Sequence, residues 1–152
     1  MKQIAILYDG DRSPADRGKA RELEEILRKK KYAVTRHSVG SIGEMNHFLE
    51  ATKPENCQFV VGFNLAGYQL ETTGGLASIN RLPMNMIQYI TAPIAELDEL
   101  LGKTQSYMVT FCFTQEEAAD EVRSRYPHIW NVAACPSLAE LAALVEGADW
   151  RY

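Results

Sequence analysis

Apolar residues along the chain form short runs, and between the runs they recur at helical spacing. The short runs predict strands at residues 3–8, 32–38, 58–63, 85–91, 106–113 and 129–134. The segments between them predict helices at residues 14–31, 41–53, 75–82, 93–102, 114–126 and 137–147. Regular alternation of strand and helix is typical of a parallel sheet covered by helices on both faces.

The pattern inside each strand indicates its place in the sheet. Residues 3–8 are almost continuously apolar, as expected of a strand buried on both faces, whereas residues 32–38 alternate and indicate a strand nearer the edge. Residues 1–152 therefore predict a single Rossmann-like α/β domain of three layers with a mostly parallel six-stranded sheet. We expect the strand order 3-2-1-4-5-6, and a flavodoxin-like order is the alternative.

Composition narrows the class of protein. The 152 residues are 46% apolar and 24% charged, with a net charge of −4, which argues against nucleic-acid binding. No apolar run approaches the length of a membrane span, and the first run is too short for a signal peptide. The three cysteines form no CxxC pair, so we expect no metal site, no cofactor and a reducing cytoplasm.

In open α/β sheets a ligand binds outside the carboxyl ends of the strands, where the strand order reverses. In the expected order this point lies between strands one and four. The loops after strands one, three and four carry the predicted ligand-binding residues: Asp9, Gly10, Asp11, Asn64, Gly67, Tyr68, Glu71, Thr72, Thr73, Gly74, Gly75 and Thr91.

The loop at residues 64–75 is the longest irregular connection that the pattern predicts. Backbone N–H groups at residues 72–75, before a helix, would suit an anion, and the glycines are equally compatible with a tight turn that binds nothing. Tyr68 and Glu71 would add a stacking surface and a hydrogen-bond acceptor, which suits a sugar or a nucleoside. The predicted partner is a small polar or anionic ligand.

Several familiar sites are missing from the sequence. It has no GxGxxG after the first strand, no P-loop and no hydroxyl-rich loop for a flavin phosphate. Asp9 and Asp11 do not predict a phosphoacceptor, because Asn64 follows strand three where an aspartate is needed. His37, His47 and His128 have no identifiable serine or cysteine partner, so no catalytic residue is predicted. The basic residues 28–31 predict either a phosphate patch or a solvated helix end.

Residues 60–91 resemble the strand–loop–helix–strand of the N-terminal half of GT-B glycosyltransferases of the spore-maturation type. The matching residues are Phe63, Asn64, Gly67, Asn80, Leu82 and Pro83. The first strand and residues 21–34 also fit, so the resemblance extends over about residues 1–135. It implies a bacterial, cytoplasmic protein that has the acceptor-facing half and lacks the donor-binding half, with no sugar transfer on its own.

Three functions follow as hypotheses. The first is a stand-alone binding domain for a small polar ligand, such as a sugar or nucleotide, or for a partner protein. The second is a glycosyltransferase subunit that acts with a separate donor-binding chain. The third is a structural or regulatory module that forms a homodimer.

Overall fold

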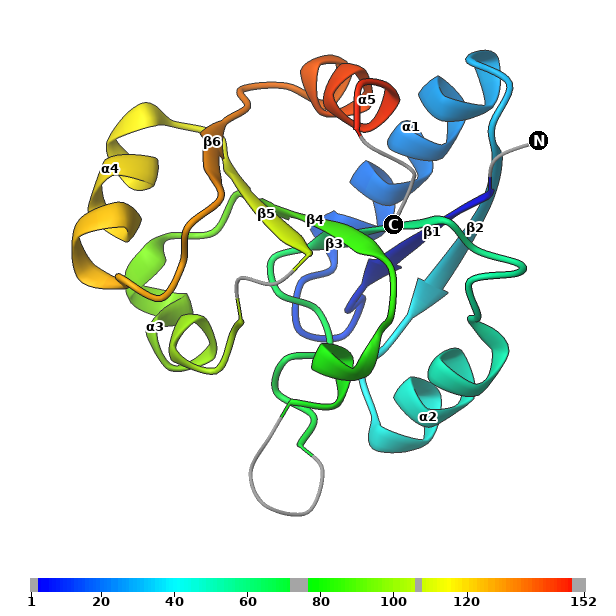
Figure 1. Ribbon diagram of the computed structural model, residues 1–152, viewed down its shortest axis with the longest axis horizontal. Coiled ribbons are helices and arrows are strands. Elements are labelled where there is room, and N and C mark those ends of the chain that lie inside the picture. Colours follow the sequence, from blue (N-terminus) through cyan, green and yellow to red (C-terminus); the bar gives the residue numbers. More distant parts are fainter. Residues whose placement is uncertain (1–2, 72–76, 106–107, 149–152) are drawn as a thin grey trace.

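The predicted α/β fold is confirmed by the computed structural model, which describes residues 3–71, 77–105 and 108–148 (Figure 1). Its six strands form one parallel sheet. The strands are β1 (Gln3–Tyr8), β2 (Ala33–Ser38), β3 (Phe59–Phe63), β4 (Asn85–Ile90), β5 (Val109–Phe113) and β6 (Val132–Ala134).

Each strand is followed by a helical segment, as the sequence predicts. These are α1 (Ala15–Lys29), α2 (Ile42–Ala51), η1 (Ser78–Arg81), α3 (Ile94–Gly102), α4 (Glu116–Arg125) and α5 (Leu138–Glu146). The third segment is a single 3-10 turn rather than the longer helix expected over residues 75–82. Within the described residues, no helix is long and apolar enough to cross a membrane.

The strand order is β2-β1-β3-β4-β5-β6, so the expected order 3-2-1-4-5-6 is wrong and the flavodoxin-like alternative holds. Strand β3 lies beside β1, where Val60 pairs with Ala5. All five β3 residues are buried, whereas β2 exposes Thr35 and Arg36. An apolar strand such as β3 gains more burial inside the sheet than at its edge, which β2 occupies instead.

Two hydrophobic cores separate the sheet from its helices. On one face, α1 and α5 lie side by side and pack Leu23, Leu27 and Leu141 against Ile6 and Val61 of the sheet (Figure 1). On the other face, α2, η1, α3 and α4 cover the alternate residues of the same strands. This arrangement leaves both ends of the parallel strands to the connecting loops.

Candidate functional site at the carboxyl edge of the sheet

The strand order reverses between β1 and β3, not between strands one and four as expected. The loops that follow β1 and β3 are therefore direct neighbours. They carry most of the predicted ligand-binding residues, and the loop after β4 lies beside them. The predicted edge of the sheet is therefore the place where the polar residues gather.

Asp9 joins the loop after β1 to the loop after β3. Its buried carboxylate accepts hydrogen bonds from the backbone N–H groups of Asp11 (3.1 Å) and Arg12 (3.0 Å) through Oδ1. Its Oδ2 accepts a hydrogen bond of 3.0 Å from Nε2 of Gln69. The Gly10 N–H points toward Ser38 Oγ, 3.5 Å away. Asp9 thus holds the backbone of its own loop, while Asp11 is exposed.

Asn64 uses its whole side-chain amide to tie three elements together. Its Oδ1 accepts hydrogen bonds from the backbone N–H groups of Thr91 (2.8 Å) and Ala92 (2.9 Å). Its Nδ2 donates to Asp16 Oδ2 (2.9 Å) and to Thr91 Oγ1 (3.0 Å). A carboxamide offers two donors and two acceptor lone pairs, so this side chain has nothing left for a ligand. Asn64 is a clamp in this structure rather than a binding group.

The backbone at Asn64 also explains the residue type. Asn64 and Leu65 both have positive φ, 51° and 57°. Asparagine tolerates this left-handed region better than most residues. The buried side chain of Gln88 supports the turn, because its Oε1 accepts a hydrogen bond of 3.1 Å from the Leu65 N–H. The chain can therefore leave β3 abruptly while its polar groups stay paired.

A buried carboxylate and a lysine complete this network, and the sequence pattern did not predict either of them as site residues. The Asp16 side chain is 1% exposed, and Lys19 Nζ lies 3.9 Å from its Oδ1. The same Lys19 Nζ donates to Thr91 Oγ1 at 3.2 Å. Thr91 is thereby held by both Asn64 and Lys19 at the carboxyl end of β4.

Two other predicted residues have structural rather than ligand-facing positions. Tyr68, expected to offer a stacking surface, is fully buried in the core beneath α2 and η1, so this expectation is wrong. Its hydroxyl has no hydrogen-bond partner among the described residues, and burial raises its pKa. Gly67 has φ of 92° and packs against Met45, which leaves no room for a side chain.

The far part of the long loop is tied to α3. Glu71 forms an ion pair with Lys103, at the end of that helix, and a bridge with Ala77. Arg81 lines a small hollow between α2 and η1. Thr72, Thr73, Gly74 and Gly75, the predicted anion-binding turn, lie outside the described residues.

An open groove of about 520 Å³ runs from Thr91 along the carboxyl ends of β4 and β5. Its polar lining comes from Thr91, Thr114, Gln115, Glu117 and Glu121. The groove also meets the first turns of α3 and α4, and neither helix has a side-chain cap among the described residues. Hydroxyl, amide, carboxylate and backbone N–H groups therefore face one space beside the Asn64 network.

A second groove of about 460 Å³ lies between β2 and α2. It brings together His37, His47 and Glu44, although the sequence places the two histidines on separate elements. Burial, and then the charge of His47, lower the pKa of His37. In the described part of the chain, no group of three or more His, Cys, Asp or Glu residues could hold a metal ion.

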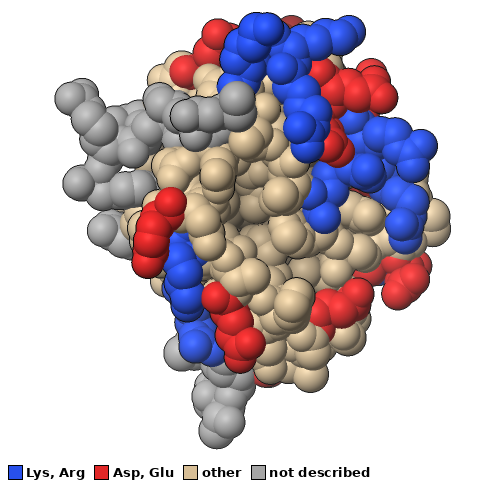
Figure 2. Space-filling view, turned by 90° about the vertical axis from the view of Figure 1, so that its right-hand side faces the viewer, with Lys and Arg blue, Asp and Glu red and all other residues tan. Residues whose placement is uncertain are grey.

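Two of the four basic residues at positions 28–31, at the end of α1, have acidic partners. Figure 2 shows Lys and Arg side chains gathered toward the top of the face that includes this helix end. Arg28 Nε lies 2.8 Å from Glu24 Oε2, and Lys30 Nζ lies 2.9 Å from Glu146 Oε2 of α5. This arrangement favours a solvated helix end over a phosphate patch.

Known proteins add no further guide to this site. Neither models of protein families nor curated proteins nor solved structures gave a significant match to the chain.

Proposed function

We propose that this domain binds a neutral, hydroxyl-rich ligand of the sugar class in the groove at the carboxyl ends of β4 and β5. The observation that carries the proposal is the lining of that groove. Thr91, Thr114 and Gln115 offer hydroxyl and amide groups, and Glu117 and Glu121 offer carboxylates. Sugar hydroxyls both donate and accept hydrogen bonds, so they match this mixture of groups.

The charges in the groove favour a sugar over a nucleotide. Among the described residues, its lining contains two glutamates and no lysine or arginine. Glu121 is ion-paired with Arg125 at 2.8 Å, which leaves Glu117 as the carboxylate in the lining without an ion-pair partner in the described part of the chain. Lys19 lies beside Thr91, but its ammonium group is engaged with Thr91 and Asp16. A phosphate would meet the like charge of Glu117, whereas a neutral hydroxyl can donate to that carboxylate and form a strong, charge-assisted hydrogen bond.

The hydrogen bonds among Asn64, Asp16, Lys19 and Thr91 also support the proposal. Thr91 receives hydrogen bonds from Asn64 and Lys19, so its hydroxyl is held in place at the end of β4. A binding group on a rigid strand end loses little conformational freedom when a ligand arrives. The network thus acts as support, and the groove acts as the recognition surface.

The resemblance of residues 60–91 to the N-terminal half of GT-B glycosyltransferases agrees with a sugar ligand. In that hypothesis the groove would bind an acceptor, and a separate chain would supply the donor-binding half. The domain would then bind sugars by itself and transfer none. No residue in the groove is proposed as catalytic.

NMR titration of the ¹⁵N-labelled domain tests the proposal. We expect neutral mono- and oligosaccharides to shift the amide resonances of Thr91, Thr114 and Gln115, and nucleoside monophosphates to leave them unchanged. Glu117→Gln should weaken sugar binding by about tenfold, in line with a hydrogen bond to a charged group. Glu116→Gln, in the same helical turn but outside the groove lining, is the matched control.

The proposal fails if a broad panel of neutral sugars leaves these three resonances unmoved. It also fails if Glu116→Gln and Glu117→Gln weaken binding equally. The effect would then come from the negative charge in the first turn of α4 rather than from contact between Glu117 and the ligand.

A further inference from the structure

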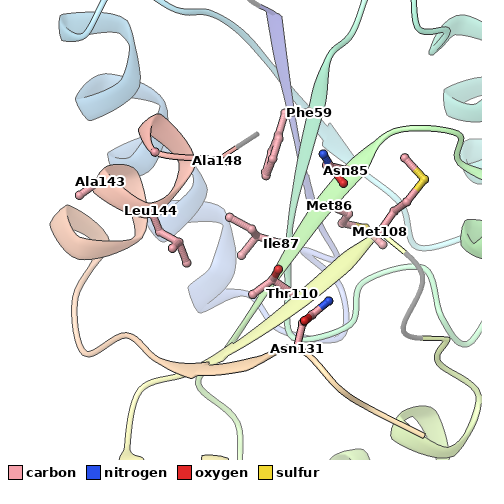
Figure 3. Close-up of a pocket in the computed structure, with 11 residues that line it drawn as sticks. Phe59, Asn85, Met86, Ile87, Met108, Thr110, Asn131, Ala143, Leu144 and Ala148 are labelled. Carbon is pink, nitrogen blue, oxygen red and sulfur yellow. The ribbon is translucent and has the colours of Figure 1, made fainter. Parts of the chain in front are cut away.

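A third groove lies at the opposite end of the strands from the proposed sugar site. It has a volume of about 340 Å³ and sits where β4, β5 and the approach to β6 begin, beneath the last turn of α5 (Figure 3). Along β4 its lining ends at Ile87, and the lining of the sugar groove begins at Ile90, three residues or about 10 Å farther along the strand. This groove is therefore distinct from the proposed sugar site.

The walls of this groove are apolar. Ile87 of β4 and Leu144 of α5 point toward one another, and Phe59 of β3 closes one side (Figure 3). Ile87 and Phe59 are almost fully buried, while Leu144 is 37% exposed, which is unusual for a leucine next to the core. Gly147 and Ala148, which directly follow α5, also line the groove. Because these residues are small, they leave the space between the helix and the sheet open.

The polar groups that the described residues bring to this groove are uncharged. Asn85 and Asn131 bring carboxamides from the starts of two different strands, and Thr110 lies between them in the sheet (Figure 3). Asn131 Nδ2 is 3.5 Å from the Val109 carbonyl oxygen, at the limit of a hydrogen bond, so little would be lost if it turned to a ligand. Among the described residues that line the groove, none has an ionisable side chain.

We propose that this groove binds an uncharged aromatic molecule that carries an amide-like edge, such as a nucleobase or an aromatic carboxamide. The ring would lie between Phe59, Ile87 and Leu144, where it removes apolar surface from water. The donor–acceptor edge would meet Asn85 and Asn131, because carboxamides pair with groups that present one donor beside one acceptor. A charged ligand would lose hydration here and gain no counter-charge.

A pair of nearly isosteric probes tests this chemistry. We expect nicotinamide and adenine to shift the side-chain NH₂ resonances of Asn85 and Asn131 in the ¹⁵N-labelled protein, at low millimolar concentration. Nicotinate has the shape of nicotinamide with a negative charge, and pyridine lacks the amide edge. Each should bind at least tenfold more weakly than nicotinamide.

Two variants place the binding in this groove. Asn131→Leu removes one carboxamide, and Leu144→Asp adds a charge at the partly exposed rim, where it should not unfold the protein. Each should weaken nicotinamide binding at least tenfold, and Asn46→Leu, on the exposed face of α2, should not. The proposal is overturned if neither probe moves the asparagine resonances, if nicotinate binds as well as nicotinamide, or if Leu144→Asp leaves the affinity unchanged.

Discussion

The side-chain amide of Asn64 donates hydrogen bonds to both carboxylate oxygens of Asp16, at 2.9 and 3.2 Å. Both residues are buried, and they come from β3's loop and from the first turn of α1. Burying a carboxylate costs free energy unless it is hydrogen-bonded. The hydrogen bonds from Asn64 therefore allow α1 to pack against the carboxyl edge of the sheet with Asp16 buried.

We predict that Asn64→Ala lowers the free energy of unfolding by about 3–4 kcal/mol, because Asp16 and two backbone N–H groups lose a buried partner. Alanine also tolerates the positive φ of 51° poorly. Asn64→Gly loses the same hydrogen bonds without that strain, and should be about 1 kcal/mol more stable than Asn64→Ala. Urea unfolding measures both. The exposed Asn46→Ala is the control, and an equally large loss there would contradict the prediction.

Gly62 and Gln88 face each other across β3 and β4, where a Cβ on Gly62 would come within 2.9 Å of Gln88 Oε1. We predict that Gly62→Ala destabilises the protein by about 1–3 kcal/mol, because it displaces a buried side chain that supports the turn at Leu65. In the double variant Gly62→Ala/Gln88→Ala the new methyl group has room. The double variant should therefore lose less stability than the sum of the losses in Gly62→Ala and Gln88→Ala. Strict additivity in urea unfolding would show that the two residues do not compete for space.

Much of the fold follows from the local pattern. The apolar run at residues 3–8 is a strand that is buried from Ile4 onward, and the alternating run at residues 32–38, predicted to lie nearer the edge, forms the edge strand. Ser41 and Ser137, at the expected starts of two helices, each accept a hydrogen bond from the N–H group three residues later, in the manner of a capping box. Helix α4 begins at Glu116, two residues after the expected start at residue 114.

Strand order is harder to predict, because right-handed crossovers permit both orders that the sequence left open. The decisive signal is in β3, where the run FVVGF is as apolar as β1 and is therefore unsuited to an edge. In either order the loops after β1, β3 and β4 lie at the carboxyl edge, and the observed order makes the loops after β1 and β3 direct neighbours. This is why Asp9, Asn64 and Thr91 lie in one region, although the strand order reverses between β1 and β3 and not at the predicted point between strands one and four.

The residues that support the site could not be predicted from local pattern. Asp16 looks like an ordinary acidic residue in the first turn of a helix, and only the packing of α1 on β3 buries it. Tyr68 in a polar loop suits a ligand-stacking surface and a core anchor equally well, and tertiary packing decides for the core. Gln88 was the one visible signal, since a glutamine inside an apolar strand needs a buried partner.

Gly18 is exposed at the end of the first turn of α1, and a Cβ there would meet nothing within 4 Å. We predict that Gly18→Ala stabilises the protein by about 0.5–1 kcal/mol, because alanine restricts the unfolded chain and is the best helix former. Gly67→Ala is the contrasting control. Its φ of 92° and the contact with Met45 should make that substitution destabilising. Thermal unfolding of both variants measures the difference, and a lower melting temperature for Gly18→Ala would contradict the prediction.

Cys112 lies in the core between the sheet and the α1–α5 layer, and burial, together with the nearby Cys135, raises the pKa of its thiol to about 12. Between pH 9 and 12 this thiol stays protonated in the folded protein, whereas it ionises in the unfolded chain. The unfolded state then binds fewer protons, so stability falls as pH rises, by about 1.4 kcal/mol per pH unit well above pH 9.

We therefore expect the free energy of unfolding, measured with urea from pH 8 to pH 10.5, to decrease over this range. Cys112→Ala should be less stable at pH 8, because it leaves a small cavity, but its stability should depend less on pH. Tyr89, whose pKa burial raises to about 12, adds a further decrease above pH 10, and Tyr89→Phe separates that contribution. If Cys112→Ala shows the same slope between pH 9 and 10 as the unaltered protein, the thiol is not the group that titrates on unfolding.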